Sequence, residues 1–394
     1  MKSIQQSIRV IFLSSLIAAC PTAAEVSPVP DALSIYDQTM DTVTRKFYDQ
    51  SFRGLPWATM VATSRGKLSG TVSDEKLNET INDLLMQLQA SHTEFLSAED
   101  QEYWALESVF SHKIDGAAFR QIGAWFVKLQ GRWFIRNVFR GSPAEKAGLL
   151  SGDEIISANG QPFEPVGSFA DTAAPTVRVA YRRSPDSPER VVEVAPESRS
   201  VQNALLVATQ SSTQTFLSGH KRIGYFHLWA GTHPAFQAAL QKAAQELSLE
   251  TDAMILDLRD GYGGSGPAYL NPFFDHDDSD HPVAQVYGKP MVVLINSGTR
   301  SGKEWLTYII KTTKRATLLG SKTAGYFRPG QPFRIQPGRF LLYLAVKGDG
   351  PPLPPEADIE GKGIAPDIEA GFELPYSAGK DAQLEAAIAF LGSN

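Results

Sequence analysis

The sequence has few of the residues that cross-link a chain or hold it in a bilayer. Its only cysteine is Cys20, so no disulfide can form within one chain of 394 residues. The mostly apolar run at residues 10–19 is far shorter than the roughly 20 residues that span a bilayer. The net charge is only -6, from 37 basic and 43 acidic residues, and no long basic run occurs. This balance argues against nucleic acid as a partner.

The N-terminus is typical of an export signal. Lys2 and Arg9 precede the apolar run, and small residues follow it, so residues 1–24 are interpreted as a signal peptide of a bacterial protein. The sequence Ile-Ala-Ala-Cys ending at Cys20 resembles the lipobox of lipoproteins, and lipidation there would anchor the protein to a membrane. Cleavage after residues 22–24 would instead discard the cysteine, and a buried apolar helix is a third interpretation. Lipidation is favoured, which places the protein in the periplasm or cell envelope.

Length and apolar content predict two or three domains. Residues 28–114 read as a helical module with a break at residues 54–56 and a turn at residues 90–93. The apolar face of its strongest helix consists of Leu77, Ile81, Leu84, Leu85 and Leu88.

Residues 115–200 change to short alternating runs between glycine turns, which predicts a β-rich domain. Residues 141–149, 152–156 and 159–160 resemble the centre of a PDZ domain, with a serine cap, proline at the first helical position and an Asn-Gly hairpin. The resemblance implies that an extended peptide adds a strand beside the loop that binds its terminal carboxylate. That loop matches Gly123, Ala124, Trp125 and Phe126, where Trp125 replaces a small residue.

Residues 201–394 alternate buried strands with helices and predict an α/β core. Strands are expected at residues 223–229, 253–258 and 291–295, and a helix at residues 234–247. A glycine-rich turn follows at residues 257–264, and a strand, sharp turn and helix start at residues 292–305. Such glycines often form only a turn, and Ser301 in the second segment could serve only as a helix cap.

Together these segments resemble the carboxyl-terminal processing peptidases, or tail-specific proteases, and the related tricorn core. The resemblance also covers residues 47–49, 54–57 and 360–367. It implies a multidomain α/β protein with a helical module, a PDZ domain and a crotonase/ClpP-like catalytic core. It further implies Ser301 as the nucleophile and the N–H groups of Gly263 and Gly302 as the oxyanion hole.

The sequence departs from many family members at the general base. Where they have a lysine in a Thr-x-Gly-Lys run, residues 323–326 read Thr-Ala-Gly-Tyr. Lys303 is a poor substitute because residues two apart on a helix do not face each other, and Lys322 precedes the expected position. In the tricorn-like branch a Ser-His pair supplies the base. His92 is therefore the candidate base, with Ser91 and Glu360 as orienting groups, although His92 could be a packing residue and Glu360 a surface carboxylate.

The acidic stretch at residues 275–281 has suitable atoms for a metal but no standard zinc spacing, so no metal or other cofactor is expected. The sequence predicts an exported serine endopeptidase that cleaves proteins or peptides. Its PDZ domain is expected to bind the substrate, and the C-terminus of the substrate is one part that it could bind. Alternatives are a catalytically inactive peptide-binding protein and a scaffold that acts only through that domain.

Overall fold

The computed structural model describes residues 31–393 except 71, 172, 279–280, 284 and 349–358. The expected signal at residues 1–24, including Cys20, lies outside the described residues, as do the side chains of residues 276–284. Among the helices that are described, none is long and apolar enough to cross a membrane.

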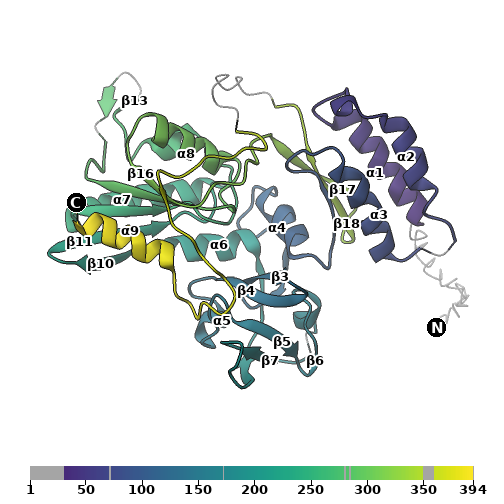
Figure 1. Ribbon diagram of the computed structural model, residues 1–394, viewed down its shortest axis with the longest axis horizontal. Coiled ribbons are helices and arrows are strands. Elements are labelled where there is room, and N and C mark those ends of the chain that lie inside the picture. The colour runs from purple at the N-terminus through teal and green to yellow at the C-terminus, as the bar shows by residue number, and fades with distance from the viewer. Residues whose placement is uncertain are drawn as a thin grey trace, which may run out of the picture. The chain divides into compact units, whose positions relative to one another are not determined.

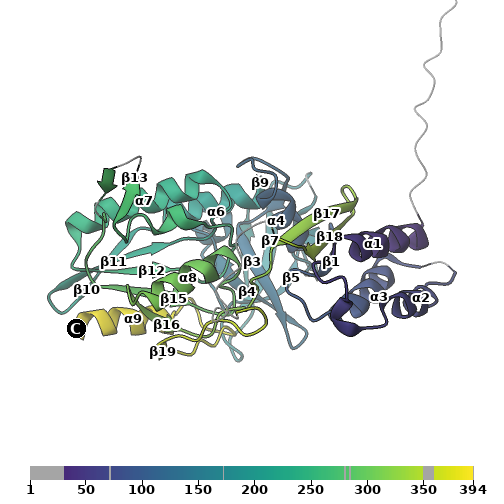
Figure 2. The same ribbon diagram turned by 90° about the horizontal axis from the view of Figure 1, so that it is seen from above.

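The described part of the N-terminal module contains the α-helices α1 (Ala32–Lys46), α2 (Trp57–Arg65) and α3 (Asp74–Met86) and the short 3-10 helix η1 (Phe52–Gly54). The predicted apolar face of α3 is buried, with Ile81 fully inaccessible to solvent. After a connecting segment at residues 87–93, β1 (Glu94–Ser97) pairs antiparallel with β18 (Phe340–Ala345), which pairs with β17 (Gly330–Gln336). The hairpin therefore completes the module, and Figures 1 and 2 show it beside α1 and α3.

The next domain begins after α4 (Gln101–Val109). Its sheet has the order β3-β4-β5-β7-β8, with β3 (Ala124–Leu129) at one end. The other members are β4 (Arg132–Val138), β5 (Glu154–Ala158), β7 (Val177–Arg182) and β8 (Arg190–Val194), and β6 (Gln161–Pro162) pairs with β5. Strands β2 (Ala118–Gln121) and β9 (Glu197–Ser200) pair with each other where the chain enters and leaves the domain.

The predicted turn chemistry of this domain is present. Ser142 caps the short helix α5 (Pro143–Lys146), and its Oγ accepts a hydrogen bond from Glu145 N at 3.2 Å. Asn159 and Gly160 both have positive φ, 50° and 76°, as a two-residue hairpin with the strand twist requires.

The C-terminal core is a mainly parallel sheet in the order β10-β11-β12-β15-β16-β19. Its strands are β10 (Gln214–Ser218), β11 (Lys221–His227), β12 (Ala253–Asp257), β15 (Met291–Ile295), β16 (Thr317–Gly320) and β19 (Ile368–Glu369). Four helices accompany it, α6 (Val201–Gln210), α7 (Pro234–Glu250), α8 (Gly302–Thr312) and α9 (Ala382–Ser393). Apolar residues of α7 and α8 share one hydrophobic core with one sheet face, whereas those of α9 pack on the other.

The carboxyl ends of β12 and β15 lie side by side, because Asp257 is in register with Leu294 in a parallel pair. The loops that follow the two strands therefore emerge at the same edge of the sheet, where ligands of such folds usually bind.

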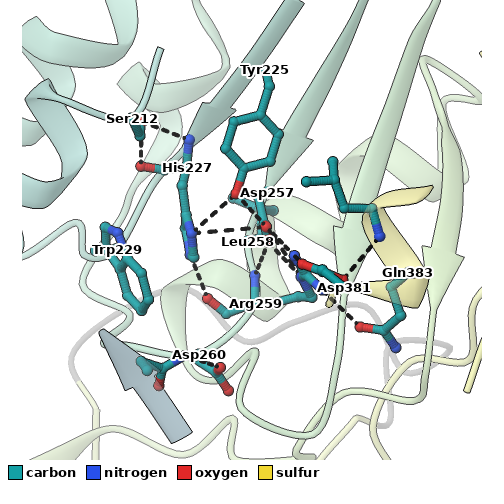
Figure 3. Close-up of polar contacts among 12 residues, drawn as sticks. Ser212, Tyr225, His227, Trp229, Asp257, Leu258, Arg259, Asp260, Asp381 and Gln383 are labelled. Atoms are coloured by element: carbon teal, nitrogen blue, oxygen red, sulfur yellow. Dashed lines mark hydrogen bonds and ion pairs between the residues drawn. The ribbon is translucent and has the colours of Figure 1, made fainter. Parts of the chain in front are cut away.

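A buried network of charges fixes the end of β12 (Figure 3). Arg259 donates to Asp257 from Nη2 at 2.6 Å and to Asp381 at 2.6 Å and 2.9 Å. The Tyr225 hydroxyl also donates to Asp257, at 2.8 Å, and His227 Nε2 lies 2.9 Å from Arg259 O. Burial opposes ionisation of Asp257, but Arg259 outweighs it and holds the pKa of this carboxyl well below its usual value.

The Arg259→Met substitution tests this network. It leaves two carboxylates without their cation, one of them fully buried, and we expect the free energy of unfolding to fall by about 3–5 kcal/mol. Urea denaturation measures this change. Arg45→Met, which removes an exposed ion pair with Asp41 on α1, serves as the control and should leave the midpoint nearly unchanged. Similar small changes in both variants would contradict a supporting role for the network.

Candidate active site

Ser301 lies in a constrained turn between β15 and α8. Its φ and ψ are 56° and -128°, which is an unfavourable conformation for a residue with a side chain. The Ser301 N–H donates to Tyr326 O at 2.8 Å, and the Glu304 carboxylate lies 3.3 Å from the same nitrogen. These contacts hold the serine at the N-terminus of α8, where the helix dipole favours developing negative charge.

Glu304 stabilises the turn and the segment beside it. Its side chain is fully buried and accepts hydrogen bonds from Thr323 Oγ1 at 2.6 Å, Gly325 N at 2.7 Å and Tyr326 N at 2.8 Å. Burial raises the pKa of Glu304, although these hydrogen bonds act in the opposite direction. The sequence interpretation missed this residue, although a glutamate three positions after a serine is the pattern of a capping box.

The expected oxyanion-hole glycines come from both loops at this edge of the sheet. A Cβ atom on Gly263 would lie 2.6 Å from Ser301 Cβ and 2.7 Å from Gly302 N, so only glycine allows the two loops to meet. Within the described part of the chain, neither the Gly263 N–H nor the Gly302 N–H has a hydrogen-bond acceptor. Gly263 also lines a small cavity together with Ser301, whereas Gly302 is not among the residues that line it.

His92 approaches from the N-terminal module. Its side chain is 4% exposed, and its Nδ1 lies 3.0 Å from Ser91 Oγ. The imidazole packs edge-on against Tyr343, with ring centroids 5.0 Å apart. Burial, with a smaller contribution from the charge of Arg300, lowers the pKa of His92 to about 3. The imidazole is therefore neutral at pH 7, which is the form a general base requires.

One small cavity brings these groups together. It has a volume of about 190 Å³, and His92, Ser301, Gly263 and Gly264 line it. The rest of its wall is largely apolar and includes Leu106, Val109, Phe110, Pro329 and Tyr343. Among the described contacts, no hydrogen bond joins His92 to Ser301, although both face the same space.

Glu360 acts on the backbone near His92 rather than on its ring. One carboxylate oxygen accepts from Ser91 N at 3.2 Å, and the other accepts from Phe327 N and Arg328 N, each at 2.8 Å. Glu360 thus connects the segment that carries Ser91 and His92 to the segment after Tyr326. The Ser91 hydroxyl contacts the imidazole directly.

Among the described contacts, neither Tyr326 nor Lys303 meets the Ser301 hydroxyl. Tyr326, at the expected lysine position, is partly exposed, and its ring centroid lies 5.7 Å from that of His92. Lys303 is fully buried, and its Nζ donates to Asp260 O at 2.8 Å and Trp229 O at 3.1 Å. Lys303 therefore fastens the start of the glycine-rich loop to the segment after β11.

The segment predicted to bind a terminal carboxylate borders two larger cavities, and in the structure all of it except Gly123 belongs to β3. Gly123 has a φ of 70°, and a side chain there would collide with Ser142. Trp125 lines both cavities, of about 870 Å³ and 480 Å³, and so do Arg300 and Tyr326. This segment and the loop that carries Ser301 therefore border the same clefts.

The acidic stretch at residues 275–281 has side chains mostly outside the described residues. In the remainder of the described chain, no group of three or more His, Cys, Asp or Glu side chains is placed to hold a metal ion.

The pH dependence of stability tests the burial of Lys303, because burial lowers its pKa in the folded chain to about 7 from its ordinary value of 10.5. Between these values the unfolded chain binds more protons, so this lysine makes the free energy of unfolding rise with pH. Urea denaturation measures the free energy of unfolding of the native chain and of Lys303→Met. We expect the value for the native chain minus the value for the variant to increase from about pH 7 to about pH 9. Lys242→Met, at an exposed position, is the control, and the difference in the free energy of unfolding between it and the native chain should stay constant over this pH range. A constant difference for Lys303→Met would contradict the assignment.

Comparisons with known proteins agree with this architecture. Residues 222–370 match the model of peptidase family S41, and residues 134–174 match that of a PDZ domain. The chain is 28% identical to carboxyl-terminal-processing peptidase 2, chloroplastic, of Arabidopsis thaliana in an alignment of 268 residues that covers 61% of this chain and 49% of the relative. It is 23% identical to the putative tricorn protease homolog 2 of Streptomyces coelicolor, over 92% of this chain and 32% of the relative.

The structure of the photosystem II D1 C-terminal processing protease has the same fold. The TM-score is 0.52 at 20% identity, with 90% of this chain and 99% of that chain covered. The chain spans about half the length of the curated carboxyl-terminal processing peptidases that it matches. The two matched domains and the shared fold show that residues 222–370 carry a domain of peptidase family S41 and residues 134–174 a PDZ domain, and that the chain is similar to the carboxyl-terminal processing peptidases.

Proposed function

We propose that this chain is a serine endopeptidase in which Ser301 attacks a peptide bond and His92 acts as general base and acid. The observation that carries the proposal is the small cavity that His92 and Ser301 line together with Gly263. These residues come from distant parts of the sequence. Their meeting in one cavity supports a shared chemical role more strongly than any of them does alone.

The chemistry follows from the positions of the groups. Ser301 Oγ forms a bond to the carbonyl carbon of the substrate while His92 Nε2 takes the hydroxyl proton. The N–H groups of Gly263 and Gly302 stabilise the resulting oxyanion. His92 then passes the proton to the leaving amine as the C–N bond breaks. Water repeats the sequence on the acyl-enzyme and releases the second product.

Ser91 and Glu360 support the base in different ways. Because Nδ1 of His92 faces Ser91 Oγ, Nε2 is left for Ser301, and the Ser91 oxygen would accept a hydrogen bond from Nδ1–H in both the neutral and the charged imidazole. Glu360 holds Ser91 through its backbone N–H.

The substrate of the proposed reaction is a protein or peptide. The PDZ domain supports this choice, since such domains bind an extended chain by adding it to a sheet edge. The segment at residues 123–126 would receive the substrate, including a chain terminus, and the adjoining cleft is also lined by His92 and by Arg300, the residue before Ser301. Export through residues 1–24 and lipid attachment at Cys20 complete the proposal and place the enzyme in the periplasm or cell envelope.

Substitutions at the two central residues test the proposal. Hydrolysis of a fluorogenic peptide library should disappear in Ser301→Ala, because no nucleophile remains. In His92→Ala, kcat should fall by at least about a thousandfold with a smaller change in KM, since proton transfer and not binding is lost. Ser248→Ala on α7 and exposed His220→Ala are the matched controls, and both should retain native turnover.

Circular dichroism and the thermal midpoint establish that each variant is folded. Equal hydrolysis by the native chain and Ser301→Ala would overturn the peptidase proposal and would favour an inactive binding protein. Unchanged turnover in His92→Ala would leave the nucleophile in place but overturn the assignment of the base.

A further inference from the structure

The edge of β3 in the PDZ domain has two backbone groups placed for strand addition. Strand β3 lies at the end of its sheet, with β4 on its inner side. The Ala124 carbonyl and the Phe126 N–H face away from β4, since residues two apart on a strand direct their backbone groups to the same side. An added peptide strand pairs with such groups.

Gln101 already occupies both groups. Its side-chain Nε2 donates to Ala124 O at 3.1 Å, and its Oε1 accepts from Phe126 N at 3.0 Å. One carboxamide supplies one N–H donor and one C=O acceptor, as one peptide unit of an added strand does. Gln101 is only 8% exposed, so this pairing is a packed contact and not a surface encounter.

The position of Gln101 is fixed by a helix outside the PDZ domain. Gln101 is the first residue of α4, and Asp100 precedes it as the N-cap. Tyr103, Leu106 and Val109 of α4 are buried in the hydrophobic core that includes the catalytic sheet. The carboxamide is therefore held at the PDZ edge by a helix anchored elsewhere, which lowers the entropic cost of the contact.

The same edge opens toward the candidate catalytic groups. The cavity of about 870 Å³ is lined by Gln101, Trp125 and Phe126 at one part of its wall and by His92 and Arg300 at another. A chain paired with β3 would thus lie in the cleft that reaches the proposed active site.

We infer that Gln101 is an internal ligand of the PDZ domain, and that an extended substrate peptide must displace its side chain to pair with Ala124 and Phe126. This inference rests on the proposed function only in taking an extended peptide as the ligand. The peptide and the Gln101 side chain then compete for the same edge of β3. The apparent affinity for the peptide falls as the fraction of molecules in which Gln101 occupies the edge rises.

Peptide binding to an inactive background tests the competition. In Ser301→Ala, Gln101 is replaced with methionine, which has a similar length but no group that can pair with the edge. The probe is a fluorescein-labelled peptide of alternating valine and serine with two N-terminal lysines and a free C-terminus, followed by anisotropy. The methionine side chain cannot make the two hydrogen bonds of Gln101, so the Kd for the labelled peptide should fall by about tenfold. Gln87→Met, at an exposed position after α3, is the matched control and should leave Kd unchanged.

Gln101→Ala provides a second variant, and the thermal midpoint of each variant shows whether it is folded. NMR of the Gln101 side-chain amide tests the displacement without any substitution of Gln101. When the peptide binds, the amide signal of Gln101 should shift to that of a solvent-exposed amide. Unchanged or weaker binding in both folded Gln101 variants, no binding by any chain, or an unmoved side-chain signal at saturation would overturn the inference.

These outcomes are separate from the test of catalysis. Hydrolysis that depends on Ser301 can persist when competition at β3 fails, which would overturn only the role of Gln101. Tighter binding in the Gln101 variants without any hydrolysis by the native chain would overturn the peptidase proposal and leave the competition intact.

Discussion

The left-handed backbone at Ser301 is the constraint on which the candidate site depends. A serine adopts this conformation at a cost of about 1–3 kcal/mol, so surrounding contacts must stabilise it. The Tyr326 carbonyl and the Glu304 carboxylate provide those contacts on one side. Gly263 allows the neighbouring loop to approach on the other, where a side chain would collide with the serine. The turn thus brings Ser301 and Gly302 into close contact with Gly263 of the neighbouring loop.

The site is assembled from segments that are far apart in the chain. His92 follows the N-terminal helices, whereas Ser301 follows β15 of the catalytic core. The β17–β18 hairpin connects them physically, since it pairs with β1 and contributes Tyr343, which packs against His92. Glu360 adds a second connection through Ser91. Correct placement of His92 therefore requires that the N-terminal module and the C-terminal half fold together.

Much of this architecture could be predicted from local sequence patterns. Periodicity identified the buried face of α3, and the order of motifs identified the PDZ domain and the turn at Ser301, because these signals depend on neighbouring residues. The β17–β18 hairpin gave no comparable sign that it completes the N-terminal module, since that pairing joins residues more than two hundred positions apart. The contacts of Gln101 were also missed, because a glutamine at a helix start has no local feature that indicates a distant strand edge. The roles of His92, Ser91 and Glu360 came from family resemblance and remain proposals.

The central claim is that a neutral, buried histidine activates Ser301 in place of the missing lysine. The most direct measurement is the rate at which a fluorophosphonate reacts with the native chain, with the modified residue identified by tandem mass spectrometry. The account predicts an adduct on Ser301 that forms at least about a hundredfold more slowly in folded His92→Ala. Absence of an adduct on Ser301, or an equal rate in His92→Ala, would contradict it.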